Sequence, residues 1–441
     1  MADPASDLST RLRAAAASLS GQGPRPAAAD LLRYLGYDDG DASAVAGRAR
    51  MLWAAAGFRR LFRLAMPDAP GLTFFGAEAD PAVLGASVVG FPLGGCAGSG
   101  LTPSHAFESC VGEGIEFLSQ FAQPGDALQA ATLDAPPVPL DPGSDRFVRA
   151  VFAACTIPAD RSVDWVPVRR MSDGTSCWFP ADLCLRRTGA DFVPPLKLST
   201  GCAAGVSRED ATLRAMLELV ERDAAALWWR GGRRGRPIVP ASEAATVAAT
   251  LLAKVRRGQG DRRTVLLDIT TDLGVPVVAA FSARPDGYGF ALGLGARTSL
   301  AEATGSAILE LCQSELSLHV IEAKRLEAGE AALNESDRRQ VARATMLDTR
   351  TCPLLQPDDA EAAPPPTLSD DPAEAIARLL AARGIVAYTL DLTRPRFEIP
   401  VVRAIAPGLQ LDPCDLIGDR LARAIAETGG GAPHSAGIVL L

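Results

Sequence analysis

Three segments of the chain carry a glutamate followed three residues later by a second acid or an amide. The pairs are Glu113 with Glu116, Glu218 with Glu221, and Glu310 with Gln313. Residues at i and i+3 lie on one face of a helix, so each pair would present its side-chain oxygens together. A single pair of this kind is most often a solvated helix face, with Arg214 and Arg222 available as counter-charges for the second pair.

The three pairs belong to an internal repeat. In each copy an alanine precedes the first glutamate with six residues between them, and a stretch containing two glycines precedes the alanine. The copies are Gly98–Glu116, Gly201–Glu221 and Gly293–Gln313. We expect each copy to be a glycine-rich loop that leads into a helix, with the polar faces of the helices converging so that four glutamates gather in one place.

Four converging carboxylates require cations. Hard oxygen ligands without His or Cys select Mg²⁺, and Mg²⁺ usually bridges carboxylates to substrate phosphates. Glycine-rich turns at helix N-termini supply backbone N–H donors for anions. The sequence contains neither a Walker A motif nor the kinase signature set. The residues alone therefore predict a magnesium–nucleotide site outside the ordinary nucleotide folds.

Capping residues and apolar periodicity place the elements that would position these side chains. We expect helices after the capping residues Thr102, Ser207 and Ser299, the first running to about Gln120. Helical periodicity also predicts helices over 6–20, 27–66, 242–256 and 372–384. Short apolar runs predict strands over 72–76, 86–91, 265–269, 275–281, 385–391 and 401–405, strands and turns over 127–195, and a surface loop over 356–372.

Composition indicates a globular protein of 441 residues with 48% hydrophobic content. Acidic residues outnumber basic ones 52 to 44, and a net charge of −8 argues against a general binder of nucleic acid or of anionic membranes. The nine cysteines include no CxxC pair, which argues against a structural zinc site and favours reduced thiols. Without a signal segment or an apolar run of about 20 residues, we expect a cytoplasmic protein.

The second copy carries a family resemblance. Ser199-Thr-Gly-Cys-Ala-Ala-Gly205 followed by Glu218-x-x-Glu221-Arg222-Asp223 resembles the STGxAAG…ExxERD signature of the YcaO family, the ATP-dependent enzymes that modify backbone amides of ribosomally made peptides. The matching segments are Ser109-x-x-x-Glu113-x-x-Glu116, Glu310-x-x-Gln313, and Asp391-Leu-Thr-Arg-Pro395 leading to Pro407-Gly408-Leu409. The resemblance covers roughly residues 90–410. It implies a mixed α/β fold of repeated strand–glycine loop–helix units around an ATP site, in a catalytic domain of residues 81–441 that follows a small helical N-terminal region of residues 1–80.

The resemblance also implies the roles of individual residues. Glu113, Glu116, Glu218 and Glu221 would be the catalytic residues, as ligands of the Mg²⁺ ions that hold ATP. Arg222 would face phosphate, and Glu310 and Gln313 would line the nucleotide side. Further nucleotide contacts would come from Ser109, Ser199, Gly201, Ala203, Gly205 and Asp210, with helix capping as the alternative role of Asp210.

The implied reaction is cyclodehydration of a precursor peptide. A Cys, Ser or Thr side chain adds to the preceding carbonyl, the oxyanion takes the γ-phosphoryl group, and phosphate leaves to give a thiazoline or oxazoline. This chemistry belongs to the biosynthesis of thiazole/oxazole-modified peptides such as bacteriocins. The implied partners are the precursor peptide, a leader-binding ThiF-like protein and a flavin dehydrogenase, with a homodimer left open.

Departures from the family pattern leave two alternatives. Ser99 stands between glycines where a basic residue is common, Phe117 replaces an arginine, and the last ten residues lack a proline-rich tail. The missing tail favours a thioamide or an amidine as the product of the same amide activation. The altered first copy favours a non-catalytic scaffold that binds a peptide or partner.

Other reactive or large side chains are interpreted as structural. Cys202 is expected to be a buried thiol rather than a nucleophile, and Trp228 and Trp229 are expected in the core. His105 is expected to be an exposed or capping residue rather than a proton shuttle. The basic loop Arg230–Arg236 is interpreted as a connector, with contact to phosphate or an acidic peptide as its alternative role.

Overall fold

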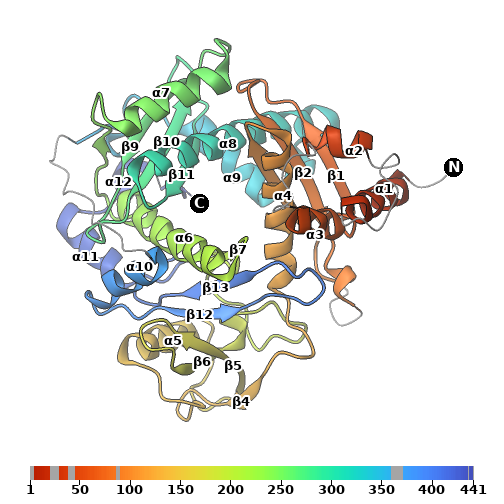
Figure 1. The fold of residues 1–441 in the computed structure, drawn as a ribbon. Coiled ribbons are helices and arrows are strands. Elements are labelled where there is room, and N and C mark those ends of the chain that lie inside the picture. Colours follow the sequence, from red (N-terminus) through yellow and green to blue (C-terminus); the bar gives the residue numbers. More distant parts are fainter. Residues whose placement is uncertain are drawn as a thin grey trace. The chain divides into compact units, whose positions relative to one another are not determined.

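A computed structural model describes residues 4–19, 29–37, 45–85, 90–358, 371–435 and 437–440. The chain forms two compact units, and both mix helices with strands (Figure 1). Unit 1 comprises Met1–Ala65, Leu72–Met216 and Ala387–Ile405, and unit 2 comprises Met66–Gly71, Leu217–Val386 and Ala406–Leu441. The mixed α/β class is confirmed, whereas the domain boundary at residue 80 stays a prediction.

Unit 1 begins with helices and a three-stranded antiparallel sheet. The helices are α1 (Pro4–Leu19), α2 (Ala29–Tyr34) and α3 (Val45–Ala55), and a 3₁₀ turn η2 spans Pro81–Leu84. The sheet order is β1 (Arg60–Leu64), β2 (Thr73–Ala79), β3 (Gly94–Gly100), and α4 (Pro103–Ser119) packs on β2 and β3. The helix expected over 27–66 is therefore wrong at 60–64. This segment is a strand because it pairs with β2, where Gly76 leaves room for the ring of Phe62.

A second sheet of unit 1 joins distant parts of the chain. Its order is β4 (Gln129–Ala131), β5 (Val163–Arg170), β12 (Tyr388–Asp391), β13 (Val401–Ile405), β7 (Cys202–Ala204), with β6 (Ser176–Pro180) also paired to β5. The 3₁₀ turn η4 spans Ala181–Leu183. The segment 127–195 also contains a helix, α5 (Pro142–Ala154), which the expectation of strands and turns missed. Asp141 caps α5, and Val148, Val151 and Phe152 form its buried stripe.

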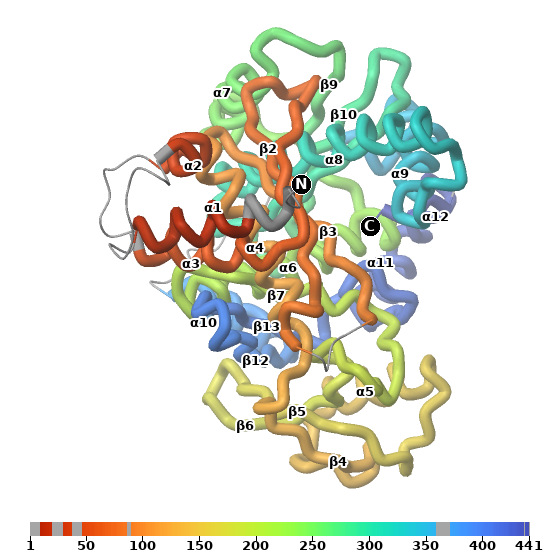
Figure 2. Tube along the Cα trace, turned by 90° about the vertical axis from the view of Figure 1, so that its right-hand side faces the viewer, coloured from red at the N-terminus to blue at the C-terminus, as the bar shows by residue number. Residues whose placement is uncertain are grey.

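Unit 2 is built on a four-stranded antiparallel sheet. Its order is β11 (Ala291–Ala296), β10 (Val277–Ala283), β9 (Arg263–Asp268), β8 (Arg236–Pro237). The long helix α8 (Leu300–Ala328) packs on β10 and β11 and contacts α7 (Glu243–Arg256). Figure 2 shows α8 beside β10. The remaining elements are η5 (Glu330–Ala332), α9 (Glu335–Met346), η6 (Pro353–Leu355), α10 (Pro372–Ala381), α11 (Asp419–Thr428) and α12 (Ala432–Ser435).

Helix α6 (Arg208–Trp229) begins in unit 1 and ends in unit 2. The expected capping residues bind the first turns of their helices, as Thr102 does in α4, Ser207 in α6 and Ser299 in α8. The strands expected over 72–76, 265–269, 275–281, 385–391 and 401–405, and the helices over 242–256 and 372–384, are confirmed within a few residues. The strand expected over 86–91 and the loop over 356–372 fall largely outside the described residues.

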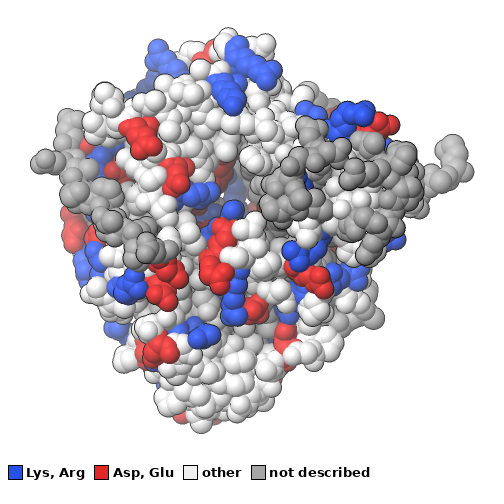
Figure 3. Space-filling view, viewed as in Figure 1, with Lys and Arg blue, Asp and Glu red and all other residues white. Residues whose placement is uncertain are grey.

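Charged side chains of both signs are interspersed on the face shown in Figure 3. The net charge of −8 is therefore not gathered into one acidic patch on this face. All nine cysteines are free, and eight of them are buried. Among the described residues, no helix combines the length and apolar character needed to cross a bilayer.

Candidate functional site

The glycine-rich segments of the first and third copies are strands rather than the loops expected from the sequence. A Cβ on Gly98 in β3 would lie 2.2 Å from the backbone nitrogen of Cys110 in α4, and a Cβ on Gly293 in β11 would lie 2.1 Å from that of Leu311 in α8. The glycines therefore let each motif helix pack directly on its own strand. Only the second copy begins with a turn, at Gly201, where φ is 75°.

In the first and third copies, the first glutamate accepts a hydrogen bond from the strand of its own copy. The backbone N–H of Ala97 donates to Glu113 Oε2 over 2.7 Å, and that of Leu294 donates to Glu310 Oε2 over 3.3 Å. Both bonds span sixteen residues of sequence. The first copy, in unit 1, and the third copy, in unit 2, thus share one local geometry.

The second glutamate accepts a hydrogen bond from the strand of the following copy. The N–H of Ala204 donates to Glu116 Oε1 over 2.7 Å, and the N–H of Ala296 donates to Glu221 Oε2 over 3.0 Å. Each donor stands fourteen residues before the first glutamate of its own copy. The internal repeat is therefore a structural repeat, and backbone donors orient its carboxylates. The convergence of all four glutamates stays a prediction.

In unit 2 one arginine forms ion pairs with both glutamates of the second copy. Arg222 lies 3.3 Å from Glu218 Oε1 and 3.5 Å from Glu221 Oε1. Burial, followed by repulsion from Glu221, raises the pKa of Glu310 to about 8. Glu218 and Glu221 together carry one more negative charge than Arg222 neutralises, and the raised pKa leaves Glu310 largely protonated near neutral pH in the absence of a cation. This donor set fits a hard divalent cation such as Mg²⁺. Within the described ranges, no three His, Cys, Asp or Glu side chains form a ready-made metal cage.

In unit 1 an aromatic ring occupies the place of the arginine common after the second glutamate. Phe117 packs on Gly94, where a Cβ would lie 2.4 Å from its ring, and against Phe121. The guanidinium of Arg186 lies over the Phe117 ring, 5.5 Å from its centroid. A positive charge is therefore present beside Phe117, although position 117 itself does not carry the arginine of the family pattern.

The Ser199–Gly205 segment contains β7, which pairs with β13. Its Ala203 is buried, and the N–H of Ala404 donates to Gly201 O over 2.7 Å. Ser109 is exposed on α4, one turn before Glu113. The Ser199–Gly205 segment is thus part of a sheet through β7. The nucleotide contacts expected for residues of this segment and for Ser109 stay predictions.

Asp210 makes the contacts of a capping residue. Its carboxylate accepts a hydrogen bond from the N–H of Val206 over 3.1 Å and pairs with Arg214 at 3.0 Å. Its own N–H donates to Ser207 Oγ over 3.1 Å. These contacts account for Asp210 through helix capping, and its expected contact with the nucleotide stays a prediction.

Arg394 is a buried residue whose role the sequence did not reveal. Its Nε and Nη2 donate to the carbonyl oxygens of Ser119 and Phe121 at the end of α4, over 2.9 and 2.8 Å. Its Nη1 pairs with Asp126 at 2.7 Å. The carbonyl groups at a helix C-terminus lack partners within the helix, and a buried arginine satisfies them here. Its position inside the Asp391–Pro395 motif was the only available signal.

Cys202, Trp228 and Trp229, interpreted as structural, are buried as expected. Cys202 is 3% exposed, and the indole N–H groups of Trp228 and Trp229 donate to backbone carbonyls over 2.8 and 2.7 Å. In the basic loop, Arg230 pairs with Asp412, and Arg236 with Asp268. His105 is exposed in the first turn of α4.

Known proteins resemble this chain in sequence and in fold. A family profile described as YcaO cyclodehydratase, ATP- and Mg²⁺-binding, matches residues 97–410. An uncharacterized protein in the tfuA 3′ region of Rhizobium leguminosarum bv. trifolii is 27% identical over 340 residues, which cover 71% of this chain and 76% of that protein.

Two solved structures illustrate the similarity in fold. A heterocyclase in complex with substrate and cofactor has a TM-score of 0.66 at 23% identity, over 85% of this chain and 52% of that protein. The YcaO protein of Methanopyrus kandleri, bound with AMPPCP and Mg²⁺, has a TM-score of 0.55 at 19% identity, over 81% of this chain and 88% of that protein. The present chain thus spans about half the length of the heterocyclase.

Proposed function

The chain belongs to the YcaO family of ATP-dependent enzymes, whose cofactors are ATP and Mg²⁺, and we propose that it cyclodehydrates Cys, Ser or Thr residues of a ribosomally synthesised precursor peptide. The observation that carries this proposal is the repeated anchoring of glutamates by backbone N–H groups. Such anchoring holds carboxylates in fixed orientations, as ligands of a metal-bound triphosphate must be.

We assign the binding of Mg²⁺ to Glu113, Glu116, Glu218 and Glu221. When bound, Mg²⁺ neutralises the charge of the triphosphate and orients its phosphoryl groups. In unit 1, Ala97 and Ala204 hold the two carboxylates through their N–H groups. In unit 2, Ala296 holds Glu221, and Arg222 pairs with both Glu218 and Glu221.

The same proposal assigns the nucleotide contacts. Arg222 faces phosphate in addition to pairing with the glutamates, because a guanidinium suits phosphate oxygens. Glu310 and Gln313 lie on the nucleotide side. The remaining contacts are assigned to Ser109, Ser199, Gly201, Ala203, Gly205 and Asp210.

The reaction follows from the chemistry of an amide. The peptide thiol or hydroxyl adds to the preceding carbonyl carbon, and the former amide oxygen takes the γ-phosphoryl group of ATP. That oxygen then leaves as inorganic phosphate while the C=N bond forms, so ADP, phosphate and an azoline are the products. An amide oxygen is a poor leaving group until it is phosphorylated, which explains the need for ATP.

The test combines product mass with nucleotide turnover. Purified protein with ATP, Mg²⁺ and a peptide containing Cys, Ser and Thr is expected to release ADP and phosphate, and the peptide to lose one water per ring. Glu218→Gln is expected to abolish both. A protein that binds no ATP in calorimetry would instead be the non-catalytic scaffold.

A thioamide or an amidine is the second candidate product. The same amide activation leads to this product, and the backbone-anchored glutamates would hold the Mg²⁺–ATP complex in either case. Product mass separates the candidates, since thioamide formation replaces oxygen by sulfur whereas cyclisation loses water.

We also propose partner proteins and a cellular place. A ThiF-like protein would present the leader of the precursor peptide, and a flavin dehydrogenase would oxidise azolines to azoles in the cytoplasm. Co-purification of the tagged chain with these proteins, with and without the precursor, tests the assembly. Turnover of a leaderless peptide at the full rate would contradict the need for a presenting partner.

A further inference from the structure

The motif helices α6 and α8 each carry a further acid on the side opposite the motif pair, which is Glu218 with Glu221 in α6 and Glu310 with Gln313 in α8. Asp223 in α6 and Glu315 in α8 each stand five residues after the first glutamate of their copy and two after the second position of the pair. At 3.6 residues per turn these offsets are about 140° and 200° around the helix. Asp223 is fully buried and Glu315 is 1% exposed.

Asp223 joins α6 to two other segments of unit 2. Its Oδ2 accepts a hydrogen bond from Arg420 Nη2 in α11 over 2.8 Å, and its Oδ1 accepts one from the N–H of Gln410 over 2.9 Å. Arg420 also pairs with Asp272 at 2.7 Å. The back of α6 is therefore fixed to α11 and to the segment that follows β13.

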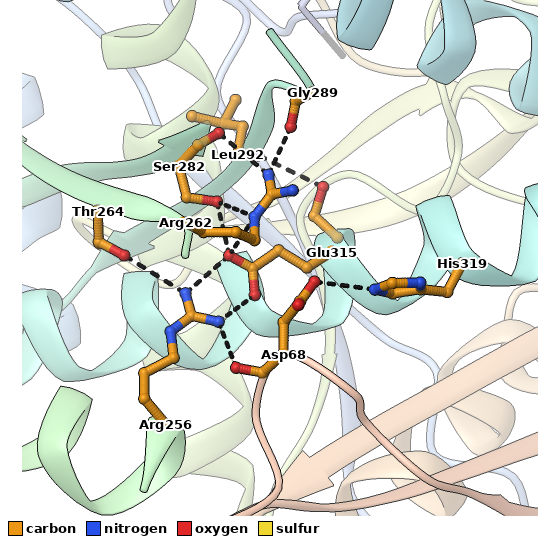
Figure 4. Close-up of polar contacts among 10 residues, drawn as sticks. Asp68, Arg256, Arg262, Thr264, Ser282, Gly289, Leu292, Glu315 and His319 are labelled. Carbon is orange, nitrogen blue, oxygen red and sulfur yellow. Dashed lines mark hydrogen bonds and ion pairs between the residues drawn. The ribbon is translucent and has the colours of Figure 1, made fainter. Parts of the chain in front are cut away.

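Glu315 joins α8 to α7 and to the sheet, as Figure 4 shows. Its Oε1 accepts hydrogen bonds from Arg256 Nη2 over 2.7 Å and from the hydroxyl of Ser282 in β10 over 2.6 Å. Arg262 Nε lies 3.2 Å from the same oxygen. Arg256 also donates to the carbonyl oxygen of Asp68, whose carboxylate contacts His319 at 2.8 Å. The back of α8 is thus fixed by two arginines from neighbouring elements.

Packing alone does not require an acid at this position. In α4, the motif helix of the first copy, the equivalent residue is Leu118, which is 1% exposed. Buried ion pairs are a poor source of stability compared with apolar side chains of similar volume, because both ions must be desolvated. The hydrogen bonds that a buried acid accepts from fixed donors have a defined direction, whereas the apolar contacts of a leucine do not. An acid on the back of a helix resists rotation of that helix about its axis.

We propose that Asp223 and Glu315 are positioning residues, which hold α6 and α8 in the rotational setting that aims Glu218, Glu221, Glu310 and Gln313 at the Mg²⁺–nucleotide site. This inference rests on the proposed function of those four residues. Neither acid touches the ligand. A displacement of about 1 Å at a reacting centre can cost about 100-fold in rate, so a small rotation of either helix is sufficient to matter.

The test compares Asp223→Asn and Glu315→Gln with a matched control. Asp182→Asn removes another buried acid, which is 2% exposed and pairs with Arg187 at 2.8 Å, but Asp182 belongs to unit 1 and to neither α6 nor α8. Calorimetry with Mg²⁺ and a non-hydrolysable ATP analogue gives the affinity, ATP turnover gives KM and kcat, and thermal unfolding gives the loss of stability.

We expect Asp223→Asn and Glu315→Gln to weaken the Mg²⁺–analogue complex by roughly 10- to 100-fold, as removal of outer-shell partners does. Asp182→Asn is expected to lower the unfolding temperature while leaving KM and the analogue affinity unchanged. If the two unit 2 variants also lose only stability, the positioning inference is overturned. If the unaltered protein binds no Mg²⁺–analogue at all, the proposed function fails instead.

Conservative variants keep the test decisive if a neutral variant does not fold. Asp223→Glu and Glu315→Asp retain the charge but move the carboxylate by one methylene. They are expected to fold and to show a smaller loss of analogue affinity than the neutral variants. Unchanged affinity and unchanged KM in folded conservative variants would overturn the inference in the same way.

Discussion

The backbone N–H of Ala296 in β11 donates to the carboxylate of Glu221 in α6 over 3.0 Å. This bond links the second copy of the repeat to the strand of the third. Leu294, two residues earlier on β11, holds Glu310 in the same manner. One short strand therefore orients carboxylates from two helices, and this arrangement motivates the first two predictions.

Removing the charge of Glu221 should abolish catalysis without unfolding the protein. Glu221→Gln keeps a side-chain oxygen that can accept from Ala296 but loses a metal-binding carboxylate, so we expect ATP turnover to fall by about 100-fold or more. Glu209→Gln, at an exposed position of the same helix, is the control and should retain turnover. Equal activity of the two variants would contradict the ligand role of Glu221.

The stability of the metal-free protein should fall as pH rises. The pKa of Glu310 is raised from 4.5 to about 8, so the folded state holds a proton that the unfolded state releases. The stabilising contribution is full below about pH 4.5 and is lost progressively up to about pH 8. Thermal unfolding between about pH 5 and about pH 9 should show this loss, and Glu310→Gln should reduce it. Saturating Mg²⁺ and ATP should flatten the profile, because a bound cation favours the ionised carboxylate. An unchanged or steeper profile in Glu310→Gln would contradict the assignment.

The glycines of β3 should differ sharply in their tolerance to alanine. A Cβ on Gly98 would lie 2.2 Å from Cys110 N, whereas a Cβ on Gly95 of the same strand meets no described atom within 4 Å. Gly98→Ala should therefore destabilise the protein by about 3 kcal/mol or more, since the backbone of α4 must move. Gly95→Ala should change the free energy of unfolding by less than about 1 kcal/mol. Urea unfolding measures both, and equal destabilisation would rule out strand–helix contact as the cause.

Arg394 should be required for stability rather than for nucleotide binding. Arg394→Met keeps the apolar volume but leaves Asp126 and two carbonyl groups at the end of α4 without their donor, at a cost of about 3 kcal/mol. Arg396→Met, at an exposed neighbouring position, should be close to neutral. Urea unfolding gives the free energies, and calorimetry should show unchanged ATP affinity in the folded variant. A weakened nucleotide complex with normal stability would reassign Arg394 to the site.

Local signals in the sequence predicted the elements that position the candidate site. The capping hydroxyls of Thr102 and Ser299 marked the starts of α4 and α8, because a side-chain oxygen at that place satisfies a free N–H of the first turn. The regular spacing of glutamates revealed the repeat, since the i and i+3 positions share a helix face. These interactions are local in the chain, and a single sequence is sufficient to see them.

Long-range contacts account for what the sequence did not reveal. From the sequence alone, the glycines in β3 and β11 cannot be told from loop glycines. Glycine is required there because α4 or α8 packs directly on the strand, and not because the chain turns. Asp223 reads as the end of a signature, but its partner Arg420 lies 197 residues away. The partners of a buried charge depend on tertiary structure, so sequence spacing alone could not identify the ion pair of Asp223 with Arg420.

The passage of α6 from unit 1 to unit 2 limits how the protein can be divided. Contacts assign Met216 to one unit and Leu217 to the other, one residue before Glu218. Unit 1 also needs 387–405 for β12 and β13, and unit 2 needs 66–71, which bonds to Arg256 through Asp68. Neither unit is a continuous stretch of chain. Fragments cut at the unit boundary would each lack a strand or segment that the unit needs. Complementation between such fragments therefore requires that they be co-expressed. Proteolysis within α6 is expected to inactivate the enzyme rather than release an independent domain.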